Sequence, residues 1–553
     1  MARAPRTALL ALVLPALACA DRTGAASGGT VLIAATADAD AMLPALRTSI
    51  GGRMVSELLF DPLCEVGPSL NTLGTADFQP RLATGWTFSA DSLVVTLALD
   101  PRARWHDGQP VVARDVVSGL AAIREPANAS SLLSDVSDID SVHVVDEHTV
   151  ALHFHARSAE QLYAASLLFP LPAHLVDTIA PGTLATSGFA QHPVGSGPYR
   201  FVSREPTVRL ELGAVADHYR GRPGPDRIAV LVSKEPSTAI AKLWTEEADV
   251  FESLPATDIA EAAKYPHARL VASKGFDYVF LAYNFRDPRD TSRAHPLLAD
   301  PALRRAVAHA VDRQAILRAV FEDSLARLGA GPVVTAQAFT DTTIAHPAFD
   351  TAAAGRLLDS LGWTRRDADG FRVKGGRRLT LRALVPAPSA NRVRAAVIVQ
   401  EQLRTVGIEM PVDKRDGQAF GAARDGGDFD LIFGGWGTTP SPRSLRGTWV
   451  SRATPNAGRL NSGNYRDPAF DAAVLEALAS SDGAVARARL RDAQRVIAED
   501  VAAVWLYENR PRAVVHRRFV LPAWRADAWW RTLPSWRVER GQALPRDATP
   551  AGG

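Results

Sequence analysis

The sequence predicts an α/β fold spread over two or three domains, and three observations support this. The chain has 553 residues, more than a single hydrophobic core usually covers. Hydrophobic residues make up 46% of it and charged residues 22%, as in ordinary globular proteins. Segments with the two-residue period of strands alternate with segments that have the spacing of amphipathic helices, which favours sheets covered by helices.

Strand signals dominate the first part of the chain. Leu93, Val95, Leu97 and Leu99 alternate with smaller or more polar residues, which predicts a strand with one face buried. The other elements expected here are a strand over 31–35, helices over 52–59 and 111–123, and strands over 142–145 and 149–152.

The second part has clearer helix signals. Asp300 is a typical cap, Pro301 suits the first turn, and the apolar stripe that follows extends to Leu317, which predicts one helix. Asp350 opens another helix, and Gly362 ends it. Strands are also expected over 278–285, 430–433 and 504–507, and helices over 393–406 and 484–500.

The N-terminus has the layout of a secretory signal. Arg3 and Arg6 precede an apolar run over 8–14 that is too short to span a bilayer, so the protein is expected to be exported. The run ends in Pro-Ala-Leu-Ala before Cys19, which resembles a bacterial lipobox and predicts lipidation of Cys19. The alternative is ordinary cleavage with Cys19 unmodified or removed. Residues 20–29 then form a flexible tether.

Composition and cysteine content exclude several classes of protein. The net charge is +2 and the arginines are scattered, so binding to nucleic acid has little electrostatic support. Cys64 has no visible base beside it and is expected to be a small buried residue. His153 and His155 share one face of a strand, but no carboxylate or cysteine partner is evident, so neither a metal nor another cofactor is expected.

Catalytic motifs are missing from the sequence. It contains no Gly-x-Ser-x-Gly elbow and no His-Glu-x-x-His, so the protein is not expected to be an enzyme. The run Gly195-Ser196-Gly197 lacks the lysine and the helix start of a phosphate loop, and predicts a structural turn instead.

A series of local phrases, in one order, resembles the family 5 solute-binding proteins of ABC importers, the dipeptide- and oligopeptide-binding type. The likeness extends from about Val31 to about Trp536. The phrases cover 79–91, 103–116, 193–201, 284–285, 303–316, 349–363, 403–408, 428–436 and 464–465.

The resemblance implies a bilobed periplasmic-binding-protein fold of type II, similar to cluster C, in which the lobes close around a ligand. One lobe is expected from residues 30–60, 190–275 and 506–545, with 61–189 as a subdomain inserted in it and 546–553 as a tail. The other lobe is expected from 276–505. The chain should cross between the lobes near Gly275 and near Tyr507.

The resemblance also implies ligand contacts. Trp436 is the first candidate, because its indole offers a flat apolar face and an N–H donor. In peptide-binding members an aspartate that takes the ligand's α-ammonium group stands at the position of Thr439, and a hydroxyl cannot neutralise that charge. Free-amine peptides are therefore not expected to bind unless an acid elsewhere substitutes. The other candidates are Thr438, Thr439, Tyr283, Asn284 and Arg446. Arg443, like Arg446, could meet an anionic group of the ligand, but is expected at the solvated surface.

The function implied is transport. A monomeric receptor in the periplasm or cell envelope, lipid-anchored through Cys19, captures a peptide-like or other small polar ligand and delivers it to a permease and ATPase complex. Two alternatives remain at this point: an exported hydrolase, and a sensing or chaperone protein on the same fold.

Overall fold

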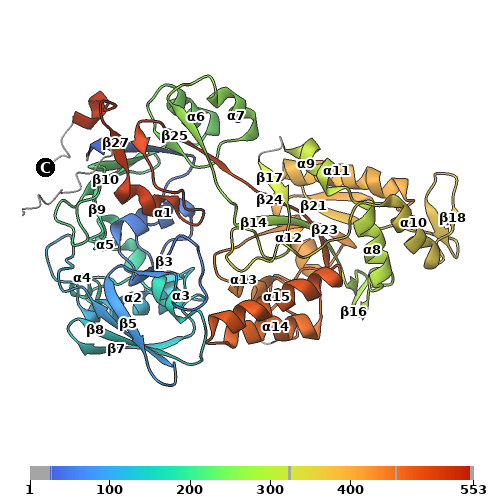
Figure 1. Ribbon diagram of the computed structural model, residues 1–553, viewed down its shortest axis with the longest axis horizontal. Coiled ribbons are helices and arrows are strands. Elements are labelled where there is room, and N and C mark those ends of the chain that lie inside the picture. The colour runs from blue at the N-terminus through green and yellow to red at the C-terminus, as the bar shows by residue number, and fades with distance from the viewer. Residues whose placement is uncertain (1–24, 27, 322–324, 455–456, 549–553) are drawn as a thin grey trace, which may run out of the picture.

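The molecule consists of two lobes that lie side by side in Figure 1. The computed structural model describes residues 25–26, 28–321, 325–454 and 457–548. The first lobe contains the early, central and last parts of the chain, drawn in blue, cyan, green and red. The second lobe, in yellow-green to orange, is built from one continuous stretch.

The first lobe is organised around a seven-stranded sheet. Its strands are contributed by segments far apart in the chain, and β2 runs parallel to its neighbours β11 and β12. The order is β13 (Ala268–Ala272), β25 (Arg512–His516), β12 (Val250–Phe251), β2 (Thr30–Ala35), β11 (Arg227–Val232), β10 (Arg209–Ala214) and β9 (Tyr199–Glu205). The small sheet β1 (Ala25–Ala26), β27 (Arg537–Glu539), β26 (Phe519–Val520) lies beside it.

An antiparallel subdomain packs against this lobe. Val95, Leu97 and Leu99 of β6 are buried, as their alternation predicts. Its residues share one continuous core with the seven-stranded sheet, so the subdomain and the lobe form a single packed body. Its elements are the sheet β5 (Ala83–Phe88), β6 (Val94–Leu99), β8 (Thr149–Phe154), β7 (Ile139–Asp146), the pair β3 (Cys64–Val66) and β4 (Phe78–Pro80), and helices α2 (Ala113–Arg124) and α3 (Gln161–Ser166).

The second lobe has a six-stranded mixed sheet between two layers of helices. On β14, Val279 and Leu281 face the core under α8, α9 and α11, whereas Tyr278 and Phe280 face the core under α14 and α15. The sheet order is β17 (Ala326–Leu328), β24 (Ala503–Asn509), β14 (Asp277–Tyr283), β23 (Leu431–Gly437), β21 (Ala383–Pro386), β22 (Val412–Arg415). Because β24 remains in this sheet to Asn509, the lobe extends past the boundary expected at residue 505.

The single helix predicted after Asp300 is in fact two. Helix α8 spans Pro301–Ala310, and α9 spans Arg313–Val320. Between them Val311 and Asp312 are extended, and the Asp312 side chain accepts a hydrogen bond from the backbone N–H of Ala315. Asp312 therefore caps a second helix, although the apolar spacing continues across the break.

The remaining elements are helices of various lengths and small antiparallel sheets around the two main sheets. The helices are α1 (Ile50–Leu59), α4 (Ala173–Val176), α5 (Gly188–Gln191), α6 (Pro236–Trp244), α7 (Ala256–Ala262), α10 (Thr351–Ser360), α11 (Ala390–Thr405), α12 (Gly417–Gly426), α13 (Arg443–Thr448), α14 (Pro468–Ala479) and α15 (Gly483–Glu499). Two hairpin sheets, β15 (Arg286–Asp287) with β16 (Asp290–Ala294), and β18 (Arg365–Arg366), β19 (Arg372–Lys374), β20 (Arg377–Arg378), lie on the second lobe.

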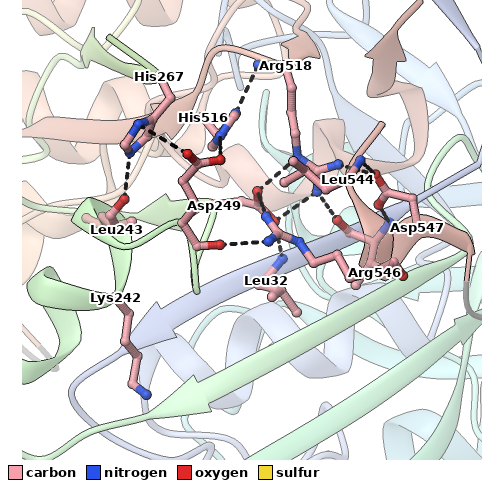
Figure 2. Close-up of polar contacts among 12 residues, drawn as sticks. Leu32, Lys242, Leu243, Asp249, His267, His516, Arg518, Leu544, Arg546 and Asp547 are labelled. Carbon is pink, nitrogen blue, oxygen red and sulfur yellow. Dashed lines mark hydrogen bonds and ion pairs between the residues drawn. The ribbon is translucent and has the colours of Figure 1, made fainter. Parts of the chain in front are cut away.

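A buried ion network ties the C-terminal segment to the first lobe, as Figure 2 shows. Arg518 and Asp249 both have fully enclosed side chains, and Nε of Arg518 donates to Asp249 at 3.0 Å. Asp547 accepts from Arg518 at 2.6 Å and from the backbone N–H of Thr30 at 2.8 Å. Arg546 adds a second cation to Asp249 at 2.7 Å. The network therefore joins β2 to the segment that follows β27.

Candidate functional site

The chain crosses between the lobes at two adjacent places. β13 and β14 lie in different sheets, as do β24 and β25, so the crossings are residues 273–276 and 510–511. The N–H of Gly275 donates to the carbonyl of Asn509 at 3.1 Å, and a Cβ on Gly275 would lie 2.3 Å from that oxygen. The Asn509 side chain also donates to Asp277. The crossings are thus bonded to each other and form one narrow hinge.

A cavity of about 750 Å³ lies beside this hinge, between the lobes. The first lobe contributes residues 252–257 and 524–530, including Trp524 and Trp529, which stack with ring centroids 5.1 Å apart. The second lobe contributes Val320, Phe321, Leu325, Asn391 and Arg394. Cavities of this size with largely apolar walls and a few polar groups suit small ligands.

A second cavity, of about 810 Å³, belongs mostly to the first lobe, since Ala336 is the one second-lobe residue at its rim. Its carboxylates are already paired. Asp61 accepts from Arg220 and from the Tyr219 hydroxyl at 2.8 Å, and although burial opposes this, these contacts hold the pKa of Asp61 below its usual range. Glu65 pairs with Arg81 and Arg525, each at 2.8 Å. These ion pairs fit a structural role, so the interlobe cavity is the better candidate for a ligand.

The lobes also meet through a cluster of polar side chains that we call the interlobe lock: Thr72, Asp138 and Glu160 of the first lobe, and Ser441 and Arg443 of the second. Glu160, whose side chain is 1% exposed, accepts from Thr72 at 2.7 Å, Ser441 at 2.9 Å and Nε of Arg443 at 3.0 Å. Arg443 also donates to Asp138. Burial raises the pKa of Glu160. Arg443 therefore lies in a contact between lobes, which corrects its expected place at the solvated surface.

Three of the predicted ligand residues lie at the interlobe end of β23. Trp436 is half-buried, and the guanidinium of Arg424 lies 5.8 Å from its ring centroid. The backbone N–H and the hydroxyl of Thr438 both donate to the carbonyl of Phe276 in the hinge. Thr439 is exposed, and its carbonyl accepts from Gln337 at 2.8 Å. None of these three residues lines the cavity beside the hinge.

Tyr283 and Asn284 lie inside the second lobe, which corrects their expected place at the ligand. Both are fully buried. The Tyr283 hydroxyl donates to the carbonyl of Arg304 at 3.0 Å, and the Asn284 amide donates to the carbonyls of Gly427 and Phe429. These bonds use the polar groups that a ligand would need. Arg446 is half-buried on α13 and does not line the interlobe cavity, and Cys19 lies outside the described residues.

The other chemical candidates have structural environments. Cys64 is fully buried, and burial raises the pKa of its thiol. Gly195 and Gly197 pack so closely on the end of α1 that a Cβ would collide with the carbonyls of Leu59 and Leu58, as a structural turn requires. Among the residues that the structure describes, no group of three or more His, Cys, Asp or Glu side chains could hold a metal ion.

Comparison with known proteins identifies the family. The family model of the bacterial extracellular solute-binding proteins, family 5, matches residues 77–456. This chain belongs to that family. Its fold, with two lobes and a hinge of two crossings, is the one that the resemblance implies.

Individual relatives support the assignment of this protein to family 5. A Brucella ovis protein provisionally named as an ABC transporter peptide-binding protein is 28% identical over 417 residues, 74% of this chain and 75% of its own. Di/tripeptide-binding protein 2 of Pseudomonas aeruginosa is 24% identical over 78% of this chain and 81% of its own. The ABC transporter substrate-binding protein CtaP of Listeria monocytogenes matches in structure with a TM-score of 0.78 at 19% identity, covering 93% of this chain and 99% of its own.

The family assignment gives the general role. Family 5 members are extracellular solute-binding proteins, and this chain is a solute-binding receptor for an importer. In the described part of the chain, none of the helices combines the length and the apolar character needed to cross a bilayer.

Proposed function

We propose that this receptor captures a peptide-like or other small polar solute in the cavity beside the hinge and hands it, unchanged, to an ABC permease and ATPase complex. One observation carries the proposal: a cavity of about 750 Å³ is lined by both lobes, and within the described residues the chain passes between these lobes only at 273–276 and 510–511. Closure about so narrow a hinge would enclose a ligand without any covalent step.

The charges at the lobe interface support a particular kind of ligand. Thr439 brings no carboxylate to the end of β23, and the nearby acids Glu160 and Asp138 are paired with the protein's own Arg443. A free α-ammonium group therefore has no acceptor at this place. The names of the Brucella and Pseudomonas relatives support a peptide-like ligand, whose amino group would have to be blocked or bound elsewhere.

The leader of the sequence supports export to the periplasm or cell envelope, with Cys19 as a lipid anchor. Mass spectrometry of the mature protein from the native membrane tests this, because lipidation adds a diacylglycerol and an acyl chain to a Cys19 N-terminus. An N-terminus other than Cys19, or an unmodified one, would overturn the anchor and leave the receptor role intact.

Identification of the co-purifying ligand tests the function directly. Native mass spectrometry should release a small molecule from the purified protein, and adding it back should reduce the radius of gyration measured by X-ray scattering. The ligand should be recovered chemically unchanged. Its hydrolysis would favour an exported enzyme, and a radius of gyration that stays the same at saturation would overturn the closure mechanism.

A further inference from the structure

The interlobe cavity contains a carboxylate that the protein itself does not neutralise. Three acidic residues line the cavity: Glu252, Asp277 and Asp527. Asp527 pairs with Arg525 at 2.9 Å, and Asp277 accepts from the side chain of Asn509. Among the described residues neither Asp277 nor Glu252 takes part in an ion pair: Asp277 has the neutral amide of Asn509 as its donor, and Glu252 has only the indole of Trp529.

The position of Glu252 explains why it needs a partner. It follows β12 and has an exposed side chain, yet the surface it exposes faces a cavity enclosed by both lobes. Burial by these walls raises the pKa of Glu252, and the opposing effects of the Trp529 indole and of Arg53 do not cancel it. Arg53 is committed elsewhere, because its Nε donates to Glu57 at 2.9 Å. When a bound ligand and closure of the lobes remove this carboxylate from water, its charge is costly unless a positive charge pairs with it.

The cavity walls around Glu252 favour such a charge. Trp524 and Trp529 are stacked with an interplanar angle of 11°, and Trp530 stands edge-on to Trp529 with centroids 6.1 Å apart. The electron-rich faces of indoles attract cations, and their apolar rings keep water from them. The ring of Trp530 already has the guanidinium of Arg53 at 5.4 Å from its centroid, which leaves Trp524 and Trp529 for a ligand. Of the three arginines in the lining, Arg525 is already bound to Asp527 and Glu65, and Arg394 donates to the carbonyl of Val320.

We propose that Glu252, together with the tryptophans Trp524 and Trp529, forms a subsite for a positively charged group of the ligand: an ammonium, guanidinium or quaternary ammonium group. This inference rests on the proposed function, since it assigns one chemical group of the solute held in the interlobe cavity. The subsite would supply, from the first lobe, the acid that is missing at Thr439.

The subsite is tested by comparing the binding of cationic probes with the binding of matched neutral ones. The probes are trialanine, the dipeptide Arg-Ala, putrescine and glycine betaine, each with a counterpart in which the cationic group is neutral, such as N-acetyltrialanine. By calorimetry, at least one cation should bind the wild-type protein more tightly than its counterpart. Glu252→Gln should weaken this cation about 10- to 100-fold and leave the neutral counterpart unchanged, as expected for a lost charged hydrogen bond.

Control variants separate the possible failures. Glu252→Asp keeps the charge and should restore part of the affinity, and Glu247→Gln, which removes a carboxylate that is 64% exposed, should have no effect. Equal binding of both members of each pair, with no effect of Glu252→Gln, would overturn the subsite and leave the receptor role standing. If no probe binds while the co-purified ligand does bind and carries no positive charge, the subsite is overturned as well. If nothing binds and the scattering never changes, the proposed function fails with it.

Discussion

Removal of Arg443 is the sharpest test of how the two lobes hold each other. In Arg443→Ala, Glu160 would keep only the hydroxyls of Thr72 and Ser441, and Asp138 would lose its cation. The Glu160 side chain is 1% exposed when the lobes are together, so water cannot replace the guanidinium there. When the lobes separate, the carboxylate can be hydrated again. The substitution therefore penalises the closed arrangement more than the open one.

The size of the penalty follows from this geometry. Removing one partner of a fully buried ion pair costs about 3–5 kcal/mol. The Arg443 side chain is 21% exposed and two hydroxyls still donate to Glu160, so we expect about 2 kcal/mol for the closed form. That energy corresponds to a loss of affinity of about 30-fold for a ligand that binds by closure.

The assay combines calorimetry with X-ray scattering on the ligand that co-purifies with the protein. Arg443→Ala should weaken its binding and increase the radius of gyration of the ligand-free protein. Arg114→Ala is the matched control, because it removes an arginine that is 64% exposed and pairs with Asp177 within the first lobe. Wild-type affinity and scattering for Arg443→Ala would refute the reasoning, since a buried and unpaired Glu160 would then cost nothing.

Three further outcomes concern stability and the hinge. Arg518→Ala should lower the free energy of unfolding by about 3 kcal/mol in urea denaturation, because the fully buried Asp249 would keep only Arg546 as a cation and Asp547 would lose Arg518 as well; an unchanged midpoint would contradict this. Burial lowers the pKa of His106 to about 4, so folding should lose stability as the pH falls from 6.5 towards 4, and His106→Gln should flatten that part of the curve of melting temperature against pH. A curve that keeps its slope would rule out His106 as the cause. Gly275→Ala should weaken ligand binding, because its Cβ would lie 2.3 Å from the Asn509 carbonyl; wild-type affinity would show that the hinge tolerates a side chain.

Local signals in the sequence predicted most of the individual elements correctly. The alternation over 93–99 gave β6, and Asp350 and Gly362 bracket α10, with Gly362 at a φ of +83°. The break at Asp312 was missed because the same apolar stripe continues through α8 and α9, and the hydrophobic period does not record a change in helix direction. The cap residue itself was the signal that could have revealed it.

The candidate site was harder to predict, because it depends on pairs of residues distant in the chain. Glu160 and Arg443 are 283 positions apart, and neither the acid nor the base is unusual in its local sequence. Glu252 can be recognised as a candidate only from the structure, which shows that it lines the cavity and that Arg53 and Arg525 form ion pairs with other carboxylates. Tyr283 and Asn284 were misplaced for the opposite reason: they lie at the end of β14, but nearness in sequence does not tell whether a side chain points to the cleft or into the core.

The raised pKa of Glu160 leads to a last prediction that separates charge from packing in the interlobe lock. Burial of Glu160 between the lobes outweighs the attraction of Arg443, since the pKa is raised in spite of the ion pair. A group whose pKa is higher in the closed than in the open arrangement favours closure as the pH falls towards that pKa. Acidification to about pH 5 should therefore reduce the radius of gyration of the ligand-free protein.

Glu160→Gln keeps polar atoms for Thr72 and Ser441 but cannot ionise, so it should abolish this dependence and bind ligand at least as tightly as the wild type. Combined with Arg443→Ala, it should recover most of the lost affinity, because no buried charge then lacks a partner. Additive losses in the double variant would show that the lock acts through packing alone.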